Sequence, residues 1–576
     1  MTGRVSRACD GCRVRKVRCN GDQPCSQCSH LSLKCVFAPP PAKRKPGVRG
    51  RLVAQLRNSQ VNGTPVPIPN SNSSTYVGSD SSPTYSGDSV SPTAPPSVTS
   101  IAGIVNNHSS PTYHGLSLAS PLSGNAVPVP TRYTTDFFLG YLGLFEEQVY
   151  PFNPTISPAD MRVAIHNMHA DYQDAALVYA FAAVTINLTQ ESWSGGSGTD
   201  DIASEMSTLM ELAMLAHKHA EAVRNGDMGR FGELPVTLKR IATCMFLEIC
   251  MMAFKRHDRA FALLREAITM IQILNVHQYP ANPDPTTTAA SDATNDRRLS
   301  PRDIFRLKRI YWEAYIHERF LSTVAAFPCV LPPLNTGVPI GDPSIPPHID
   351  GAFARLTYLF KILDGPFLAH WIAQKDSSAP VPEMTAEWIE TKQAELDQDE
   401  ADAGEAERAL ASSGRGSFTE LQVADLLITR LWLRTLVWQF ALSHGLLRSA
   451  PPRSAHHGLS LHFPAQRLSS QLRNLVNNIQ NTSSITFHGS GIIQKLFEIT
   501  STVADVLALP LGPGQTQEEF RVRLQDFEFL VRFIFGFERI QKEQRNYLRE
   551  KLGALQEQYT IVDFSELASL SPSSTR

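Results

Sequence analysis

The chain has 576 residues, of which 42% are hydrophobic and 19% charged, so it can hold several domains and a sizeable core. Its net charge of −2 hides an asymmetry: residues 1–58 carry 13 lysines and arginines against two acids, whereas the remainder carries 40 basic and 53 acidic residues. The N-terminus lacks the apolar stretch of a secretory signal and no run approaches 18 apolar residues, so we expect an intracellular protein without a membrane span, whose basic head binds a polyanion.

Six of the nine cysteines lie between residues 9 and 35. Their spacing is C-x2-C-x6-C-x5-C-x2-C-x6-C, so the half-motif C-x2-C-x6-C occurs twice. In a reducing compartment clustered cysteines bind metal more often than they form disulfides. Tetrahedral zinc takes four ligands, so six thiolates satisfy two zinc ions only if two sulfurs are shared. The predicted ligands of two Zn²⁺ are Cys9, Cys12, Cys19, Cys25, Cys28 and Cys35.

Three other interpretations of this cysteine run stay open. A knot of three disulfides would need an oxidising compartment, which nothing in the sequence indicates. A single zinc site made by Cys9, Cys12, Cys25 and Cys28 would leave two cysteines spare. A metal store of the metallothionein type would not need basic residues between its ligands.

The cysteine run resembles the fungal binuclear zinc cluster, Zn2Cys6, of the galactose-regulator type. The spacing matches at all six positions, CRVRKVRC (12–19) matches the basic first loop of the family, and Pro24 stands where the family has a turn proline. The resemblance implies a small domain that folds around its metal and binds double-stranded DNA. It also implies that Cys9 and Cys25 are the bridging ligands.

The segment between the second and third cysteines is basic. Val14 and Val17 are three residues apart and would share one face of a short helix, leaving the basic side chains outward. Zn2Cys6 modules place such a helix in the major groove, so the resemblance implies that Arg15 and Lys16 read base edges, usually of a CGG triplet. Phosphate contacts are predicted for Arg13, Arg18, Lys34, Lys43, Arg44 and Lys45.

The residues after the cysteine run form a second basic patch, which can contact phosphates or act as a nuclear-import signal. Many family members continue into a coiled coil that dimerises them. Here only Leu52, Val53 and Leu56 form an apolar stripe, so a coiled-coil dimer is not expected. The chain would then be a monomer or a homodimer formed through its C-terminal domain, and we expect it in the nucleus.

The rest of the chain divides into a linker and a large domain. Residues 59–130 are rich in Ser, Thr, Pro, Asn and Gly and are predicted to be a disordered linker between a DNA-binding domain (1–58) and an all-α domain (131–576). Parts of that domain resemble the fungal transcription-factor regulatory domain, or middle homology region, most closely that of maltose- and starch-type activators; these parts are residues 256–277 and 309–320. Helices are predicted at 136–152, 174–188, 204–224, 237–277, 303–324 and 518–552.

No catalytic motif stands out in the large domain. His217 and His219 are two residues apart and would lie on different faces of a helix, which argues against a shared metal. Tyr311 and Trp312 are predicted to be core aromatics. Three further cysteines are predicted to be buried small hydrophobes, namely Cys244, Cys250 and Cys329.

Two acidic stretches could contact the transcription machinery or coactivators. Residues 383–407 contain ten acids and one lysine, and they are either an activating surface or a solvated helix or loop that joins two helical blocks. Residues 559–567 mix acids with aromatic and aliphatic residues, as activation segments do.

The sequence therefore predicts a DNA-binding transcription regulator and not an enzyme. We expect it to activate RNA polymerase II genes, either of a secondary-metabolite cluster or of carbohydrate utilisation. The alternative is a zinc-dependent protein-interaction scaffold without direct DNA contact.

Overall fold

The computed structural model of the chain describes two separate units, Met1–Pro111 and Thr112–Arg576. The described residues are 9–10, 12, 17, 19–30, 35–37, 130–189, 199–224, 236–280, 300–338, 341–375, 383–448, 457–479, 485, 489–509 and 516–559. The predicted linker lies outside them except for Pro130, and the acidic stretch at 559–567 lies outside them except for Tyr559.

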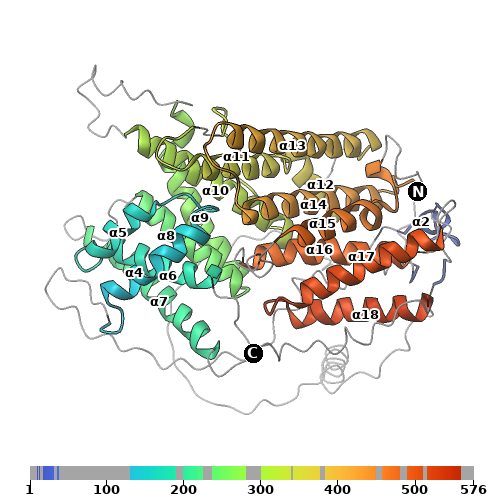
Figure 1. The fold of residues 1–576 in the computed structure, drawn as a ribbon, viewed down its shortest axis with the longest axis horizontal. Helices are drawn as coiled ribbons and strands as arrows, with labels where there is room; N and C mark the ends of the chain where they lie inside the picture. The colour runs from blue at the N-terminus through green and yellow to red at the C-terminus, as the bar shows by residue number, and fades with distance from the viewer. Residues whose placement is uncertain are drawn as a thin grey trace, which may run out of the picture. The chain divides into compact units, whose positions relative to one another are not determined.

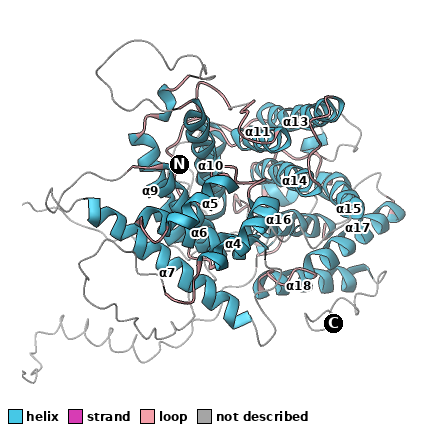
Figure 2. Cartoon of the chain, turned by 60° about the vertical axis from the view of Figure 1, so that its left-hand side comes forward, coloured by secondary structure: helices cyan, strands magenta, loops and turns pink. Residues whose placement is uncertain are grey.

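The described part of the second unit is helical (Figure 2), and among its described residues strand-like pairing is confined to an isolated bridge between Arg448 and Ser460. The predicted all-α class is therefore confirmed. None of the described helices is long and apolar enough to cross a bilayer. The helices are α4 (Thr135–Leu144), α5 (Pro158–Asn167), α6 (Tyr172–Thr189), α7 (Thr199–Arg224), α8 (Leu238–Ala253), α9 (His257–Ile273), α10 (Pro301–Ala325), α11 (Pro347–Lys361), α12 (Gly365–Lys375), α13 (Ala386–Ser412), α14 (Glu420–Ser443), α15 (Ser469–Asn478), α16 (Gly489–Leu507), α17 (Gln517–Phe535) and α18 (Lys542–Tyr559).

Helix α10 connects an early and a late group of helices. It contacts α8 and α9 of the early group and α11 and α12 of the late group, and Figure 1 shows α4 to α9 on the left and α13 to α18 toward the right. Its aromatic residues Tyr311 and Trp312 are buried, as predicted. In the early group α6 is buried along almost its whole length between α5, α7 and α8. Burial on all sides explains its weak amphipathic pattern.

Serine and threonine hydroxyls set the starts of many helices. The side chains at these N-caps accept hydrogen bonds from backbone N–H groups of the first turn, which have no partner within the helix. At α14 the cap is reciprocal, because Gln422 also accepts from the backbone N–H of Thr419. The capping residues are Thr134, Ser157, Thr237, Ser300, Thr385, Thr419 and Thr516.

Two stretches with continuous helical periodicity are each divided into two helices. Residues 237–277 contain α8 and α9, separated at Lys255, whose φ of 57° lies in the left-handed region. The N–H of Lys255 donates to Met252 O at 3.0 Å and that of Arg256 donates to Met251 O at 2.9 Å, which is the Schellman arrangement that ends helices. Residues 518–552 likewise contain α17 and α18. The division at Lys255 lets α8 and α9 pack against each other, whereas α17 and α18 both pack on α16.

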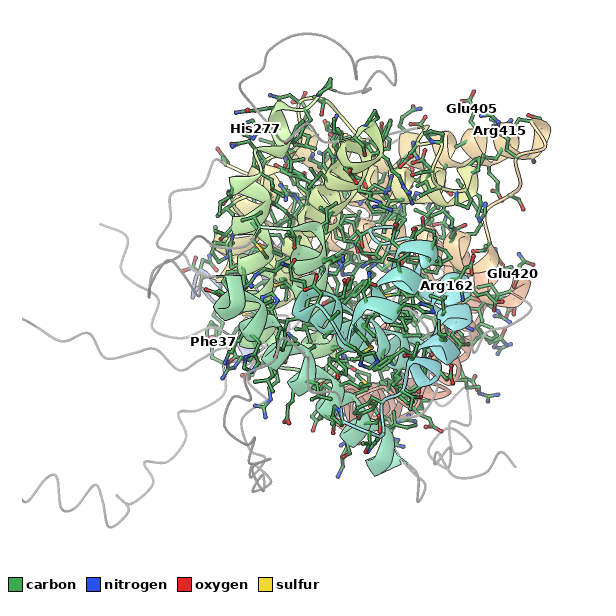
Figure 3. All side chains as sticks on the ribbon, turned by 90° about the vertical axis from the view of Figure 1, so that its left-hand side faces the viewer. Phe37, Arg162, His277, Glu405, Arg415 and Glu420 are labelled. Atoms are coloured by element: carbon green, nitrogen blue, oxygen red, sulfur yellow. The ribbon has the colours of Figure 1, made fainter. Side chains whose placement is uncertain are left out.

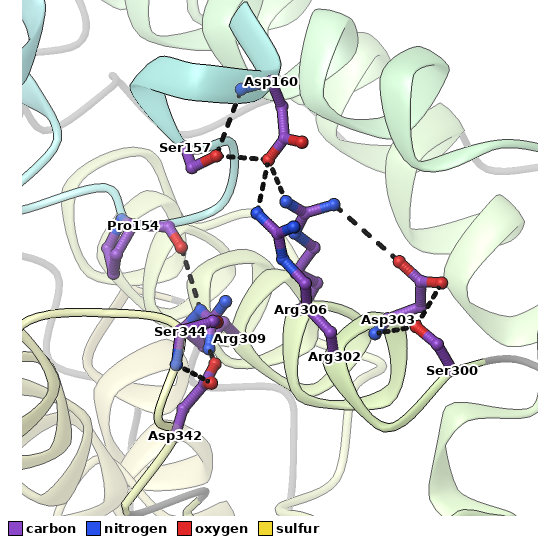
Figure 4. A network of polar contacts seen from close by, with 10 residues as sticks. All are labelled: Pro154, Ser157, Asp160, Ser300, Arg302, Asp303, Arg306, Arg309, Asp342 and Ser344. Carbon is purple, nitrogen blue, oxygen red and sulfur yellow. Dashed lines mark hydrogen bonds and ion pairs between the residues drawn. The ribbon is translucent and has the colours of Figure 1, made fainter. Parts of the chain in front are cut away.

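Polar contacts on α10 fasten it to α5 and to the loop that precedes α11 (Figure 4). Arg309 donates through Nε to Pro154 O at 2.9 Å and through Nη1 to the carboxylate of Asp342, and both side chains of this ion pair are buried. One and two turns earlier, Arg306 and Arg302 reach Asp160 in the first turn of α5. A buried charge pair is tolerated only when its hydrogen bonds are satisfied, and here they join three segments distant in sequence.

His317 on α10 is held between two buried carboxylates. Its Nδ1 lies 2.6 Å from Glu248 Oε2 on α8, and its Nε2 lies 3.2 Å from Glu313 Oε1 on α10. Burial would lower the pKa of His317, but the charges of Glu248 and Glu313 and the hydrogen bonds to them raise it to about 10.

A raised folded-state pKa makes His317 a pH-dependent source of stability. Its contribution is complete below the unfolded value of about 6.5 and is lost as the pH rises through about 10. We therefore expect His317→Gln to unfold at lower urea concentration than the parent at about pH 6, with the gap narrowing at about pH 10.5. Circular dichroism measures the urea midpoint of both proteins at the two pH values. A difference between the midpoints that does not change with pH would show that the charge of His317 does not stabilise the fold.

The acidic run at 383–407 forms most of α13, and part of it is engaged in the fold. Asp399 is buried and pairs with Arg355 and Arg430, while Asp397 and Glu400 pair with the fully buried Arg434 of α14. Other acids of the helix remain exposed, and Figure 3 shows Glu405 projecting from its outer side. The interpretation as a solvated segment therefore holds only for the outer face of α13.

Candidate metal centre and nucleic-acid interface

The six N-terminal cysteines converge in the first unit. Their thiols form two groups of four whose sulfur atoms all lie within 4.8 Å of one another. One group contains Cys9, Cys12, Cys19 and Cys25, and the other contains Cys9, Cys25, Cys28 and Cys35. Cys9 and Cys25 thus belong to both groups, as two tetrahedral sites made from six thiols require.

The sulfur–sulfur distances fit zinc. Cys9 Sγ lies 3.6 Å from Cys25 Sγ and 3.5 Å from Cys28 Sγ, and Cys12 Sγ lies 3.4 Å from Cys25 Sγ. A tetrahedron with Zn–S bonds of about 2.3 Å has edges of about 3.8 Å, so a small expansion of each group admits a metal ion. So short a segment buries too little apolar area to fold alone, and therefore the bonds between thiolates and zinc must stabilise its fold.

The repeated half-motif in the sequence appears in the backbone as a repeated hydrogen-bond pattern. The N–H of Cys12 donates to Cys9 Sγ, and the N–H of Cys28 donates to Cys25 Sγ, both at 3.4 Å. The N–H of Cys9 reaches Cys19 Sγ at 3.5 Å and that of Cys25 reaches Cys35 Sγ at 3.3 Å. These backbone donors orient the sulfurs of Cys9, Cys19, Cys25 and Cys35, and the C-x2-C spacing places the donors to Cys9 and Cys25.

Local sequence shapes the second half of the cluster. The short helix α2 (Ser26–His30) begins where the side chain of Asn20 accepts from the Ser26 N–H at 3.0 Å. Gly21 has a φ of 84°, which a residue with a Cβ rarely adopts, and the peptide bond before Pro24 is cis. The N–H of Asp10 donates to Val36 O at 2.7 Å and so closes the start of the cluster on its end.

The two shared thiols have pKa values below that of an ordinary thiol. Burial raises the pKa of Cys9 and Cys25, but hydrogen bonds from the N–H groups of Cys12 and Cys28 and contacts with neighbouring thiols lower it, to about 6 for Cys25. Burial and the neighbouring thiols raise the pKa of Cys12, and that of Cys28 to about 12. The thiolate is the form that binds metal, and a lowered pKa favours that form at the two shared positions.

The predicted DNA-contacting residues lie outside the described part of the structure. These are Arg13, Arg15, Lys16, Arg18, Lys34, Lys43, Arg44 and Lys45. Val17, which lies among them in sequence, is described and buried, and its N–H donates to Cys12 O at 3.0 Å. Its burial agrees with the expected apolar face of this segment.

The three cysteines and two histidines considered in the large domain make contacts within the helical fold. Cys244 and Cys250 are buried, and burial raises the pKa of both thiols, whereas Cys329 is only partly buried, contrary to expectation. His217 and His219 point to different neighbours, as predicted: His217 contacts Glu266, and the ring of His219 lies 5.3 Å from that of Tyr172.

Comparison with known families identifies the cysteine-rich segment. Residues 7–45 match the fungal Zn(2)-Cys(6) binuclear cluster domain, so this part of the chain is such a domain and binds two zinc ions. The domain family belongs to transcription regulators and not to enzymes, in agreement with the prediction.

Curated relatives extend the similarity beyond the cluster. The chain is 23% identical over 368 residues to the probable sucrose utilization protein of Candida albicans, a match that covers 64% of each chain and reaches into the helical domain. It is 40% identical over 57 residues to the maltose fermentation regulatory protein of Saccharomyces cerevisiae, covering 10% of this chain and 12% of that protein. It is 54% identical over 35 residues to the thiamine repressible genes regulatory protein of Schizosaccharomyces pombe, covering 6% and 4%. The chain thus spans less than two thirds of each of these relatives.

Proposed function

Because residues 7–45 are a fungal Zn(2)-Cys(6) binuclear cluster domain, we propose that the protein is a nuclear regulator of transcription that binds double-stranded DNA at CGG-type sites. The observation that carries this proposal is the pair of four-thiol groups sharing Cys9 and Cys25, interrupted by a strongly basic segment. All six cysteines act as ligands of two Zn²⁺, and the metal supplies the folding energy of the domain. The folded cluster then presents the basic segment to the major groove.

A mobility-shift assay with the full chain tests the proposal. We expect a zinc-dependent shift on duplexes that contain CGG, and loss of the shift after chelation. Single and paired CGG sites in the same assay distinguish a monomer from a homodimer formed through residues 131–576. No shift on any duplex, or one that survives zinc removal, would favour the zinc-dependent interaction scaffold instead.

Base-reading and phosphate-binding roles are separable by mutation. Arg15 and Lys16 donate to guanine edges in this proposal, whereas Lys43, in the second basic patch, contacts phosphate. We expect Lys16→Ala to weaken binding to a CGG site by roughly 1–3 kcal/mol and to relax base preference. We expect Lys43→Ala to weaken binding to all duplexes about equally and to reduce the salt slope by about one unit. Identical behaviour of the two variants in salt titrations would contradict this division.

The large helical domain regulates activation in this proposal and does not read DNA. The exposed acids of α13 are available to coactivators, and the sequence outside residues 1–58 carries an excess of acids that would repel phosphates. The names of two relatives, for sucrose utilization and maltose fermentation, favour genes of carbohydrate utilisation over a secondary-metabolite cluster. Genome-wide mapping of bound sites decides between these targets.

A further inference from the structure

Three donor atoms of different chemistry meet where α7, α8 and α9 pack together. His217 Nε2 on α7 lies 2.7 Å from Glu266 Oε1 on α9 and 3.8 Å from Cys244 Sγ on α8. All three donor atoms lie within 4.8 Å of one another. They are remote from one another in sequence and belong to none of the predicted sites.

The donor set suits a zinc ion. Imidazole nitrogen, thiolate sulfur and carboxylate oxygen are the three ligand types that zinc takes in proteins. In a tetrahedral site the nitrogen–sulfur edge is about 3.6 Å and the nitrogen–oxygen edge about 3.3 Å. The first edge is already close to its required length. The second is shorter because a hydrogen bond now joins the two atoms, and a metal ion would replace that proton.

Arg240 is the competing partner of the carboxylate and has other acceptors. Its Nη2 donates to Glu266 Oε1 at 2.9 Å and to Glu221 Oε2 at 3.2 Å, and its Nη1 donates to His217 O at 3.3 Å. The guanidinium therefore keeps two partners when Glu266 turns to a metal ion. Its positive charge stays balanced by Glu221, which limits the repulsion that a divalent cation would meet.

The site combines buried ligands with a path to solvent. His217 and Cys244 are buried, whereas the side chain of Glu266 is 35% exposed. An ion can enter past Glu266, and water can supply the fourth ligand.

We propose that His217, Cys244 and Glu266 bind one Zn²⁺ in the helical domain, separate from the two zinc ions of the N-terminal cluster. When the ion binds, the thiol of Cys244 releases its proton to solvent. Nε2 of His217 gives up its proton either by deprotonation of an imidazolium ring or, in a neutral ring, by a change of tautomer that leaves the proton on Nδ1. The ion links α7 to the α8–α9 pair and stabilises their junction. This site does not depend on the DNA-binding function proposed above.

The test uses the full chain with all six cluster cysteines replaced by serine, so that no cluster thiol contributes. We expect one zinc ion per chain by metal quantitation after equilibration with zinc chloride and gel filtration. Adding Cys244→Ser or His217→Gln should remove it. Two matched changes on the same helices should retain it: Cys250→Ser on α8, which is equally buried, and His219→Gln on α7, which is two residues from the proposed ligand.

A second readout guards against misfolding of the variants. Zinc should raise the thermal unfolding temperature of the parent and of both control variants, but not of the Cys244 and His217 variants, all with matching far-ultraviolet circular dichroism. Absence of bound zinc in the parent overturns the proposal. So does zinc that persists in both ligand variants, since it would then be held elsewhere on the chain.

Discussion

Cys25→Ser is expected to remove both zinc ions from the N-terminal cluster and to abolish specific DNA binding. Cys25 belongs to both four-thiol groups, so its loss leaves each site with three ligands. Binding of structural zinc contributes about 10–16 kcal/mol in short zinc-dependent peptides, so a domain of this size does not fold without it. Metal quantitation and a mobility-shift assay on a CGG duplex measure the two losses.

A terminal ligand provides the matched control. Cys35 belongs to one group only, so Cys35→Ser should spare the group of Cys9, Cys12, Cys19 and Cys25 and retain one cluster ion. Equal loss of zinc in the Cys25 and Cys35 variants would contradict shared ligation. The count should be made relative to the parent, because the helical domain is proposed to hold a further ion.

Arg309→Ala is expected to lower the free energy of unfolding of the helical domain by about 3–5 kcal/mol. The change leaves the Asp342 carboxylate, which is 4% exposed, without its charged partner, and it leaves Pro154 O without the Arg309 donor. An unpaired buried charge costs far more than the attraction of an exposed pair contributes. Urea unfolding followed by circular dichroism measures the difference.

Arg302 is the control on the same helix. Its side chain is 50% exposed and lies 3.3 Å from Asp160, so Arg302→Ala should change the stability by about 1 kcal/mol or less.

Replacing both Arg309→Met and Asp342→Leu should destabilise less than Arg309→Ala alone, because no buried charge is then left unpaired. If Arg309→Ala and Arg302→Ala lower the free energy of unfolding equally, burial does not determine how much the Arg309–Asp342 ion pair contributes to stability.

The sequence alone determined the metal centre. All six cysteines lie within residues 9–35, and the coordination number of zinc turns their count into a requirement for two shared thiols. The long amphipathic helices α7 and α10 were also predictable, because their periodicity extends over many turns. Local chemistry and local spacing were sufficient in both cases.

Only the tertiary structure decided what depends on contacts between distant segments. Periodicity continues across 237–277, but the left-handed turn at Lys255 divides it so that α8 and α9 can pack on each other. The composition of 383–407 suggested a solvated segment, yet Asp399 is buried because Arg355 and Arg430 reach it from α11 and α14.

The metal site proposed in the helical domain also depends on contacts that the sequence does not reveal. His217, Cys244 and Glu266 stand on three separate helices, so no short spacing motif connects them. In the sequence the near neighbour of His217 with a metal-binding side chain is His219, which lies on another face of the same helix. The packing of α7 against α8 and of α8 against α9 brings the three donors together, because helix packing and not chain proximity decides which distant side chains meet.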